Sequence, residues 1–296
     1  MTGVGNVDWV EHWRQLVSKR EAQSRAVQTK ETATGNFWDR RASSFNEMTR
    51  QRSDQQDRFL ELVSSVVDKG TMVMDVGSGV GRHSIPLAKI AKEVIAIEPS
   101  EQMGKYLESN VEAEGIRNIR VIRSTWEKTS QMEPVQVVIC SHVIYSIEDI
   151  VPFVQKVSDH ADKYCFFMIR ANQVDGHLSE LWKLVHGTER EPEPNLMDFY
   201  NLLHQIGIVA NVEIVPFGSG SGSRWTYSTW DGAIEHCRSW LYTPPGGRED
   251  DIINHYLKKA LVEQDGRYVL PAPQVRAGVV WWQQEDRGLL MFPRLT

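Results

Sequence analysis

Short apolar runs separated by helix-length stretches dominate the middle of the chain. Five of these runs are rich in β-branched and aromatic residues and are bounded by turn residues: 71–76, 93–97, 119–122, 135–140 and 164–169. Strands that alternate with helices predict βαβ units, which form a parallel sheet covered by helices on both faces. We therefore expect an open α/β fold.

Helical periodicity surrounds these strands. Apolar residues at three- and four-residue spacing predict an amphipathic helix over residues 7–27. A second helix is expected over 54–69, where Gly70 would end it, and a third over 100–114, where Ser100 is a suitable N-cap. These helices supply apolar faces that can cover the sheet.

The last third of the chain departs from simple alternation. A helix is expected over 196–206, a strand over 212–216, helical segments over 229–241 and 250–264, and a final strand over 278–282. The Gly/Ser run at 218–223 has the composition of a flexible linker. The organisation that we expect has three parts: a helical N-terminal extension over 1–53, a core over 54–217 and 275–296, and a helical insertion over 218–274.

Composition narrows the class of protein. The 296 residues are 41% hydrophobic and 24% charged, as in an ordinary globular protein, and the formal net charge of −6 opposes a broad cationic nucleic-acid face. Three cysteines without CxxC spacing predict neither a disulfide framework nor a metal site. No signal peptide or membrane-length apolar run is present, so we expect a cytoplasmic protein.

Candidate chemistry begins with the run Val73-Met-Asp-Val-Gly77-Ser-Gly79-Val-Gly81. Glycines at the end of a first strand let the backbone turn tightly and approach a ligand at the edge where open α/β sheets bind. About twenty residues later Glu98 ends the second strand, and a carboxylate there can accept hydrogen bonds from two ribose hydroxyls. The pair predicts a nucleoside-containing cofactor.

The spacing of the glycines disfavours NAD. A dinucleotide fingerprint is G-x-G-x-x-G, and its third glycine would fall at position 82, which is Arg82. Asp75, just before the turn, suits a ligand that carries an ammonium group better than it suits a pyrophosphate.

Three segments resemble the class I S-adenosylmethionine-dependent methyltransferases, in particular the small-molecule branch that includes quinone-biosynthesis enzymes. They are Met74-Asp-Val-Gly-Ser-Gly-Val-Gly-Arg, Ile97-Glu-Pro-Ser-Glu-Gln-Met103 and Val137-Val-Ile-Cys-Ser-His-Val-Ile-Tyr145. The resemblance implies a Rossmann-like seven-stranded sheet of order 3-2-1-4-5-7-6 with strand 7 antiparallel. It also implies S-adenosyl-L-methionine as cofactor and S-adenosylhomocysteine as product.

The same resemblance assigns roles to residues. Asp75, Gly77 and Gly79 would border the methionine moiety, and Glu98 would hold the ribose. The other positions implied at the cofactor are Ser78, Pro99, Met103, Thr125, Trp126, Ser141 and Trp38. The family often places an acid after strand three to meet the adenine amino group; here either Glu127 or a backbone group would do this.

The end of strand four is expected to form the acceptor wall. The run Cys140-Ser-His-Val143 lacks the Asn/Asp-Pro-Pro-Tyr/Phe of amino-group methyltransferases that act on nucleobases, and it has no acid for magnesium. His142 is a candidate general base or a structural histidine, and Tyr145 orients a substrate or simply packs.

Two further segments complete the expected site. The run Phe37–Phe45 resembles the family's aromatic lid, and residues 218–274 lie where the family adds a substrate cap. The tryptophans of this insertion, Trp225, Trp230 and Trp240, either line an apolar pocket or pack the insertion onto the sheet.

The function expected from the sequence is methyl transfer from S-adenosylmethionine to O, N, S or C of a small molecule, by a monomer or homodimer without nucleic-acid or membrane partners. Three alternatives stay open: a non-catalytic S-adenosylmethionine-binding module, an NAD-dependent oxidoreductase, and an RNA or protein methyltransferase.

Overall fold

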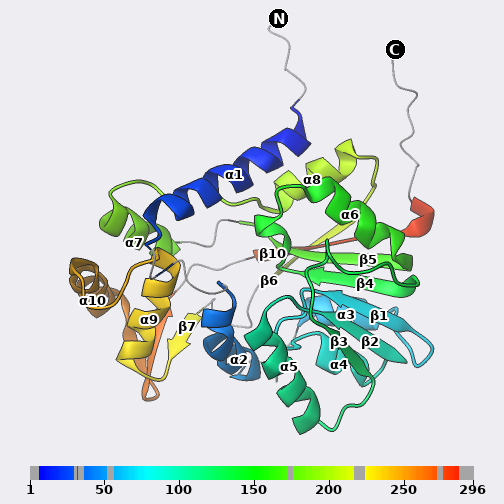
Figure 1. Cartoon of the computed structure of the whole chain (residues 1–296), viewed down its shortest axis with the longest axis horizontal. Helices are drawn as coiled ribbons and strands as arrows, with labels where there is room; N and C mark the ends of the chain where they lie inside the picture. The colour runs from blue at the N-terminus through cyan, green and yellow to red at the C-terminus, as the bar shows by residue number, and fades with distance from the viewer. Residues whose placement is uncertain are drawn as a thin grey trace, which may run out of the picture.

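A seven-stranded sheet lies at the centre of the computed structural model, in the order β3-β2-β1-β4-β5-β10-β6 (Figure 1). The structure describes residues 7–29, 32, 37–51, 57–172, 176–216, 224–271 and 276–286. The strands of this sheet are β1 (Met72–Val76), β2 (Glu93–Ile97), β3 (Ile119–Ile122), β4 (Val135–Ser141), β5 (Ala161–Arg170), β6 (Asn211–Pro216) and β10 (Arg276–Gln283). Because β10 runs antiparallel to both β5 and β6, it is the predicted strand 7, and the predicted order is confirmed.

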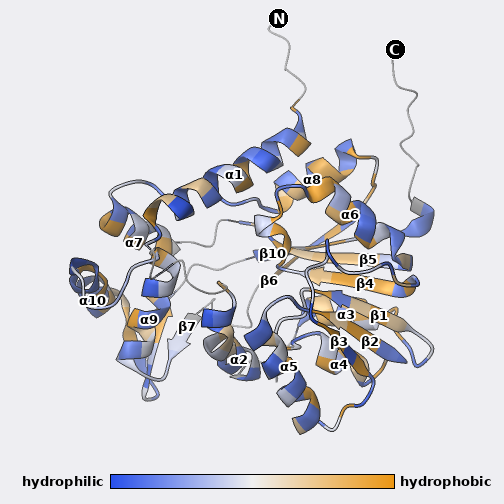
Figure 2. Ribbon diagram, in the orientation of Figure 1, coloured by the Kyte–Doolittle hydropathy of each residue, from blue (hydrophilic) through white to orange (hydrophobic). Residues whose placement is uncertain are grey.

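Helices cover the two faces of this sheet. Residues of α1 (Trp9–Val27), α6 (Ile150–Asp159) and α8 (Leu196–Gln205) join one core, and residues of α3 (Arg58–Ser64) and α4 (Ser84–Ala88) join the other. The short helices η2 (Ile144–Ser146) and η3 (Gln284–Asp286) follow β4 and β10. Figure 2 shows the apolar strands between helices of mixed character. Both faces of the parallel strands are therefore buried, as the sequence predicts.

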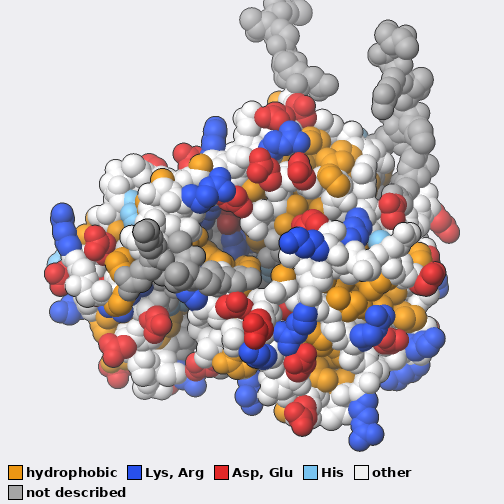
Figure 3. All heavy atoms as spheres, viewed as in Figure 1, with side chains coloured by type: hydrophobic (Ala, Val, Ile, Leu, Met, Phe, Trp, Pro, Cys, Tyr) orange, Lys and Arg blue, Asp and Glu red, His pale blue; other side chains and the backbone are white. Residues whose placement is uncertain are grey.

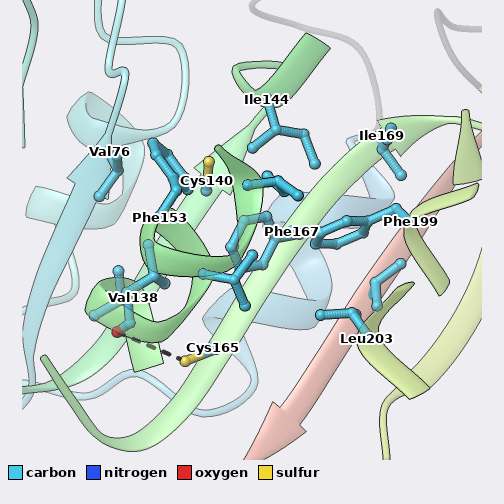
Figure 4. Close-up of a cluster of buried hydrophobic side chains, with 14 of the residues drawn as sticks. Val76, Val138, Cys140, Ile144, Phe153, Cys165, Phe167, Ile169, Phe199 and Leu203 are labelled. Atoms are coloured by element: carbon cyan, nitrogen blue, oxygen red, sulfur yellow. Dashed lines mark hydrogen bonds between the residues drawn. The ribbon is translucent and has the colours of Figure 1, made fainter. Parts of the chain in front are cut away.

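Alternation along β5 separates the two cores. Cys165, Phe167 and Ile169 point into the core beneath α6 and α8, whereas Phe166 and Met168 point into the other. Phe167 lies against Phe199 of α8, with ring centroids 5.1 Å apart (Figure 4). All three cysteines are free and buried, in agreement with the sequence analysis.

The N-terminal part of the chain contributes two separate pieces. The long helix α1 packs against α8 and α6, and Trp13 is fully buried there. The turn η1 (Asp39–Arg41) and the helix α2 (Ala42–Gln51) instead lie against α5 (Glu101–Ala113). We expected a helix over 54–69. Among the described residues, the helix in this region, α3, is shorter and ends at Ser64.

The segment between β6 and β10 forms a second, smaller unit, which we call the cap. It consists of α9 (Trp230–Leu241), α10 (Arg248–Ala260) and a three-stranded antiparallel sheet of β7 (Arg224–Tyr227), β9 (Arg267–Pro271) and β8 (Val262–Gln264). With α7 (Gly176–His186) it shares a hydrophobic core of its own, separate from both cores of the large sheet. Figure 1 shows these elements grouped on one side of the large sheet.

The expectation of a purely helical insertion is therefore wrong. The helix expected over 250–264 ends at Ala260, and a hairpin begins at Val262. Asp265 and Gly266 have φ of 52° and 70°, the left-handed pair that a two-residue hairpin turn requires. An Asp-Gly pair is the sequence signal of such a turn. The linker expected at 218–223 lies outside the described residues.

Candidate cofactor and acceptor site

The glycine turn after β1 is held against the end of β2. The amides of Gly77 and Ser78 both donate to the Ile97 carbonyl, at 2.8 and 3.0 Å. Gly77 has φ of 77°, and a Cβ there would overlap the Val143 side chain. Only glycine fits this position, because both the backbone conformation and the close approach of Val143 exclude a side chain.

Glu98 joins the turn through its carboxylate. Its Oε2 accepts from the Gly79 amide at 2.7 Å and its Oε1 accepts from the Ser100 amide at 2.8 Å. The side chain is 5% exposed, and this burial raises the pKa of Glu98 although both backbone amides oppose the shift. Each carboxylate oxygen keeps a further lone pair with which to accept a hydroxyl.

Two more polar groups lie at the turn. The carboxylate of Asp75 is buried and accepts from Ser84 Oγ at 2.5 Å, and burial raises the pKa of Asp75. Ser78 Oγ is buried without a hydrogen-bond partner among the described residues. Buried polar atoms are normally paired, so this hydroxyl fits a position that a ligand completes.

The predicted lid lies on the turn. Asp39 Oδ1 accepts from Ser100 Oγ at 2.5 Å and from the Gln102 amide at 3.1 Å, which fastens η1 to the start of α5. Phe45 packs in a cluster with Ala42, Val80, Met103 and Tyr106. Val80 lies between Gly79 and Gly81, so this cluster joins the lid to the glycine turn. Trp38 stands beside Phe45, with ring centroids 6.2 Å apart.

The residues expected at the adenine have different surroundings. Pro99 is exposed beside Glu98, whereas Met103 is buried under the lid. Trp126 is buried beneath α6, where its Nε1 donates to the Phe153 carbonyl at 3.3 Å. Its indole therefore belongs to the core, and the half-buried Thr125 is the better placed of the two for a side-chain contact.

The end of β4 brings His142 and Tyr145 together. His142 has φ of 58°, and its amide donates to the Met168 carbonyl at 2.8 Å. Its Nδ1 is 2.7 Å from the Tyr145 hydroxyl, which also accepts from the Arg170 amide at 2.9 Å. The Tyr145 hydroxyl can donate to His142 Nδ1 while it accepts from Arg170, in the tautomer that carries the imidazole proton on Nε2. Ser141, beside them, makes a weak contact to Met168 Sδ at 3.7 Å.

Burial and the nearby Arg170 cation lower the pKa of His142 well below its ordinary value. The imidazole is therefore neutral at physiological pH. With its proton on Nε2 it presents a hydrogen-bond donor, and a general-base role requires the other tautomer, in which the Tyr145 proton loses this acceptor.

Sequence reasoning missed Arg170, the last residue of β5. Its guanidinium lies 4.6 Å from the centroid of the Tyr145 ring and forms an ion pair with Glu193. A signal was present, because β5 ends at the same edge of the sheet as β4 and ligands bind at that edge. The sequence analysis also did not single out Arg41, because its partners Ser239 and Trp240 belong to the cap.

The face of the molecule shown in Figure 3 is hollowed between the cap and the core of the large sheet.

No helix in the described part of the chain has both the length and the apolar character to cross a membrane. Within the same ranges, no group of three His, Cys, Asp or Glu side chains is arranged to hold a metal ion.

Comparison with known proteins gives partial sequence matches and a clear structural one. Residues 73–163 match the model of a methyltransferase domain. The ribosomal RNA small subunit methyltransferases G of Streptomyces avermitilis and Streptomyces coelicolor are 36% and 35% identical over 80 residues, which are 26% of this chain and 34% of each relative. The chain thus matches about a third of the length of these curated relatives.

Two solved structures share the fold. The YcgJ protein of Bacillus subtilis superposes with a TM-score of 0.51 at 15% identity, over 76% of this chain and 97% of that one. A Bacillus halodurans protein gives a TM-score of 0.52 at 15% identity, over 77% of this chain and 98% of that one.

Proposed function

We propose that this chain, in which residues 73–163 form a methyltransferase domain, transfers a methyl group from S-adenosylmethionine to a small-molecule acceptor. The observation that carries the proposal is the hydrogen bond from the Gly79 amide to Glu98 Oε2 at 2.7 Å. It joins the glycine turn to a carboxylate that could accept ribose hydroxyls, at the sheet edge where open α/β folds bind ligands.

The residues at that point fit the cofactor. Asp75 would face the ammonium group, the turn from Gly77 to Gly79 the methionine moiety, and Glu98 the ribose hydroxyls. The unpartnered Ser78 Oγ supplies a further polar contact. A buried carboxylate with a raised pKa gains from a cationic ligand, because the ligand's charge offsets the cost of desolvation.

Methyl transfer requires the protein mainly to position the acceptor against the methyl group. The acceptor's lone pair forms a bond to the methyl carbon while the carbon–sulfur bond breaks toward sulfur, which loses its positive charge. The chain must align the acceptor and exclude water. The neutral His142, held by Tyr145 at the end of β4, would orient the acceptor through a hydrogen bond, and an acceptor proton would pass to water.

A small acceptor is favoured because two segments flank the site. Phe45 of the lid packs with Val80 of the glycine turn, and Arg41 of η1 donates to the Ser239 carbonyl of α9 in the cap. The net charge of −6 also opposes a phosphate backbone as partner. The curated relatives act on ribosomal RNA by name, so an RNA acceptor is the main rival.

An NAD-dependent oxidoreductase is the weaker rival. Arg82 stands where the fingerprint's third glycine would be, and its guanidinium donates to Asp57 Oδ2 at 2.7 Å.

We also retain the predictions of a cytoplasmic location and of a monomer or homodimer.

The test follows the methyl group. The protein is incubated with methyl-tritiated S-adenosylmethionine and either a panel of organic acids, amines, phenols and thiols or 16S ribosomal RNA. We expect label in the small-molecule fraction, lost in Glu98→Ala and kept in Glu101→Ala, whose side chain is exposed. Label confined to RNA would contradict the proposed acceptor class.

A further inference from the structure

Arg41 is a buried cation at the junction of lid and cap. It is 6% exposed and donates to the Phe37 carbonyl at 3.1 Å and to the Ser239 carbonyl. Its guanidinium carbon lies 3.4 Å from the centroid of the Phe37 ring and 4.6 Å from that of Trp240. Among the described residues, no carboxylate lies within ion-pair distance of this arginine.

Unsatisfied donors gather around this cation. Arg41 Nε and Trp240 Nε1 are both buried without a hydrogen-bond partner among the described residues. Three other buried polar atoms nearby in the cap are in the same condition: Tyr227 OH, His236 Nε2 and Thr243 Oγ1. The ring of His236 lies near those of Trp225, Tyr227 and Trp240, in tilted and edge-on arrangements. Native structures leave few such atoms unpaired, so a group of them at one junction indicates a ligand.

The chemistry of these atoms selects an anion. Arginine Nε–H and indole Nε1–H can only donate, so both require an acceptor. A buried guanidinium without a counter-charge is costly, and desolvation lowers the pKa of Arg41 to about 9. Two donors match the two oxygens of a carboxylate.

We propose that Arg41 Nε and Trp240 Nε1 bind the carboxylate of the methyl acceptor, so that the substrate is a small organic acid. This inference rests on the proposed function. The position supports it, because α2, which begins directly after Arg41, lies between α9 and β7 on one side and α5 on the other (Figure 1). Ala42 packs toward the glycine turn, while its neighbour Arg41 reaches the cap. The anion would therefore be held next to the cofactor site.

The test uses fluorinated probes read by ¹⁹F NMR. The probes are 4-fluorobenzoate, its neutral amide 4-fluorobenzamide, and 4-fluorophenyl phosphate. With the protein saturated by S-adenosylhomocysteine, we expect 4-fluorobenzoate to bind at least tenfold more tightly than either other probe. Equal binding of the amide, or no binding of the benzoate at 50 mM, would overturn the proposal. Tighter binding of the phosphate would overturn the carboxylate assignment.

Variants locate the site. Trp240→Phe keeps an aromatic ring and removes the N–H, and should weaken 4-fluorobenzoate at least fivefold. Arg41→Met removes the charge and should weaken it at least tenfold. The matched control is Trp230→Phe, also in α9, because Trp230 Nε1 already donates to Asn254 Oδ1 at 2.9 Å. Equal effects of Trp240→Phe and Trp230→Phe would contradict the site.

One more comparison separates this inference from the proposed function. S-adenosylhomocysteine carries a carboxylate of its own, and 5′-methylthioadenosine does not. If the former displaces 4-fluorobenzoate and the latter does not, the site holds the cofactor's carboxylate, and the acceptor assignment fails while the methyltransferase proposal stands. If S-adenosylhomocysteine does not bind at all, the proposed function fails instead.

Discussion

Gly79 donates its amide to Glu98 Oε2 at 2.7 Å, across 19 residues of sequence. The glycine turn that follows β1 and the acid that ends β2 are therefore one unit. Glu98 also accepts from the Ser100 amide, so the same carboxylate fixes the start of α5. A substitution of Glu98 therefore affects both the candidate ligand site and the backbone segments that support it.

Replacing Glu98 by alanine should weaken S-adenosylhomocysteine binding by roughly 1.5–3 kcal/mol, because a charged acceptor for two hydroxyls is lost. Calorimetric titration measures this change. The exposed Glu101→Ala is the control and should bind like the wild type. An unchanged dissociation constant in Glu98→Ala would remove this carboxylate from the site.

Asp75→Asn should separate stability from binding. Burial raises the pKa of Asp75, so at pH 7 the folded state carries a carboxylate that it disfavours, and the free energy of unfolding should rise in the variant. Binding of S-adenosylhomocysteine, which has an ammonium group, should weaken by roughly 1.5–3 kcal/mol. Binding of 5′-methylthioadenosine, which has none, should stay the same. An equal loss for both ligands would place Asp75 away from the ammonium.

Tyr145→Phe removes the hydroxyl that links His142 Nδ1 to the Arg170 amide. We expect kcat to fall about tenfold while the affinity for S-adenosylhomocysteine stays within twofold, because the acceptor wall and not the cofactor site is changed. A kcat equal to that of the wild type would reduce Tyr145 to packing.

The pH profile tests His142 in the wild-type protein. Burial and the Arg170 cation lower the pKa of His142 well below the ordinary value, so we expect no protonation of this imidazole near pH 6.5. We compare the dependence of kcat/KM on pH in the wild type and in His142→Gln. The wild-type profile should show no inflection near pH 6.5 that is missing from the profile of the variant. Such an inflection would mean that His142 titrates with an ordinary pKa.

Asp39→Ala should loosen the lid. The carboxylate of Asp39 accepts from Ser100 Oγ and from the Gln102 amide, and these bonds fasten η1 to α5. We expect the dissociation rate of S-adenosylhomocysteine, measured by stopped-flow fluorescence, to rise roughly 5- to 30-fold, as for the loss of about 1–2 kcal/mol. Ser228→Ala, which breaks the contact to Glu47 on the exposed side of α2, is the control. Equal rates in both variants would argue against a lid.

His236 should make the cap sensitive to acid. Burial and the Arg41 cation lower the pKa of His236 to about 3, whereas the unfolded chain keeps the ordinary value near 6.5. The unfolded state then binds the extra proton, so stability is full above pH 6.5 and falls as the pH drops toward 3. His236→Gln should reduce the slope of unfolding free energy between pH 6 and 4 by about 1.4 kcal/mol per pH unit. The exposed His255→Asn should leave the slope unchanged.

The sheet and the meeting of the glycine turn with Glu98 at one edge could be predicted because their signals are local. Buried parallel strands read as apolar runs, and Gly77 and Glu98 stand at the ends of the first two strands. The N-cap role of Ser100 was also predictable, and its hydroxyl accepts from the Met103 amide at 3.1 Å. What the sequence could not show is the second partner of that hydroxyl, Asp39, because the contact spans 61 residues.

The cap was the weaker part of the prediction. Its strands β7, β8 and β9 are short and gain their order by pairing with each other, so periodicity alone did not reveal them. In the sequence, Arg41 is one of two adjacent basic residues and carries no signal of burial. Its burial depends on contacts with Ser239 and Trp240, which lie about 200 residues away in sequence.

Calorimetric titration of the wild-type protein with S-adenosylhomocysteine, with NAD as the parallel ligand, distinguishes the two cofactors. We expect micromolar binding of S-adenosylhomocysteine and none of NAD. Binding of NAD alone would contradict it, because the turn from Gly77 to Gly81 would then hold a dinucleotide.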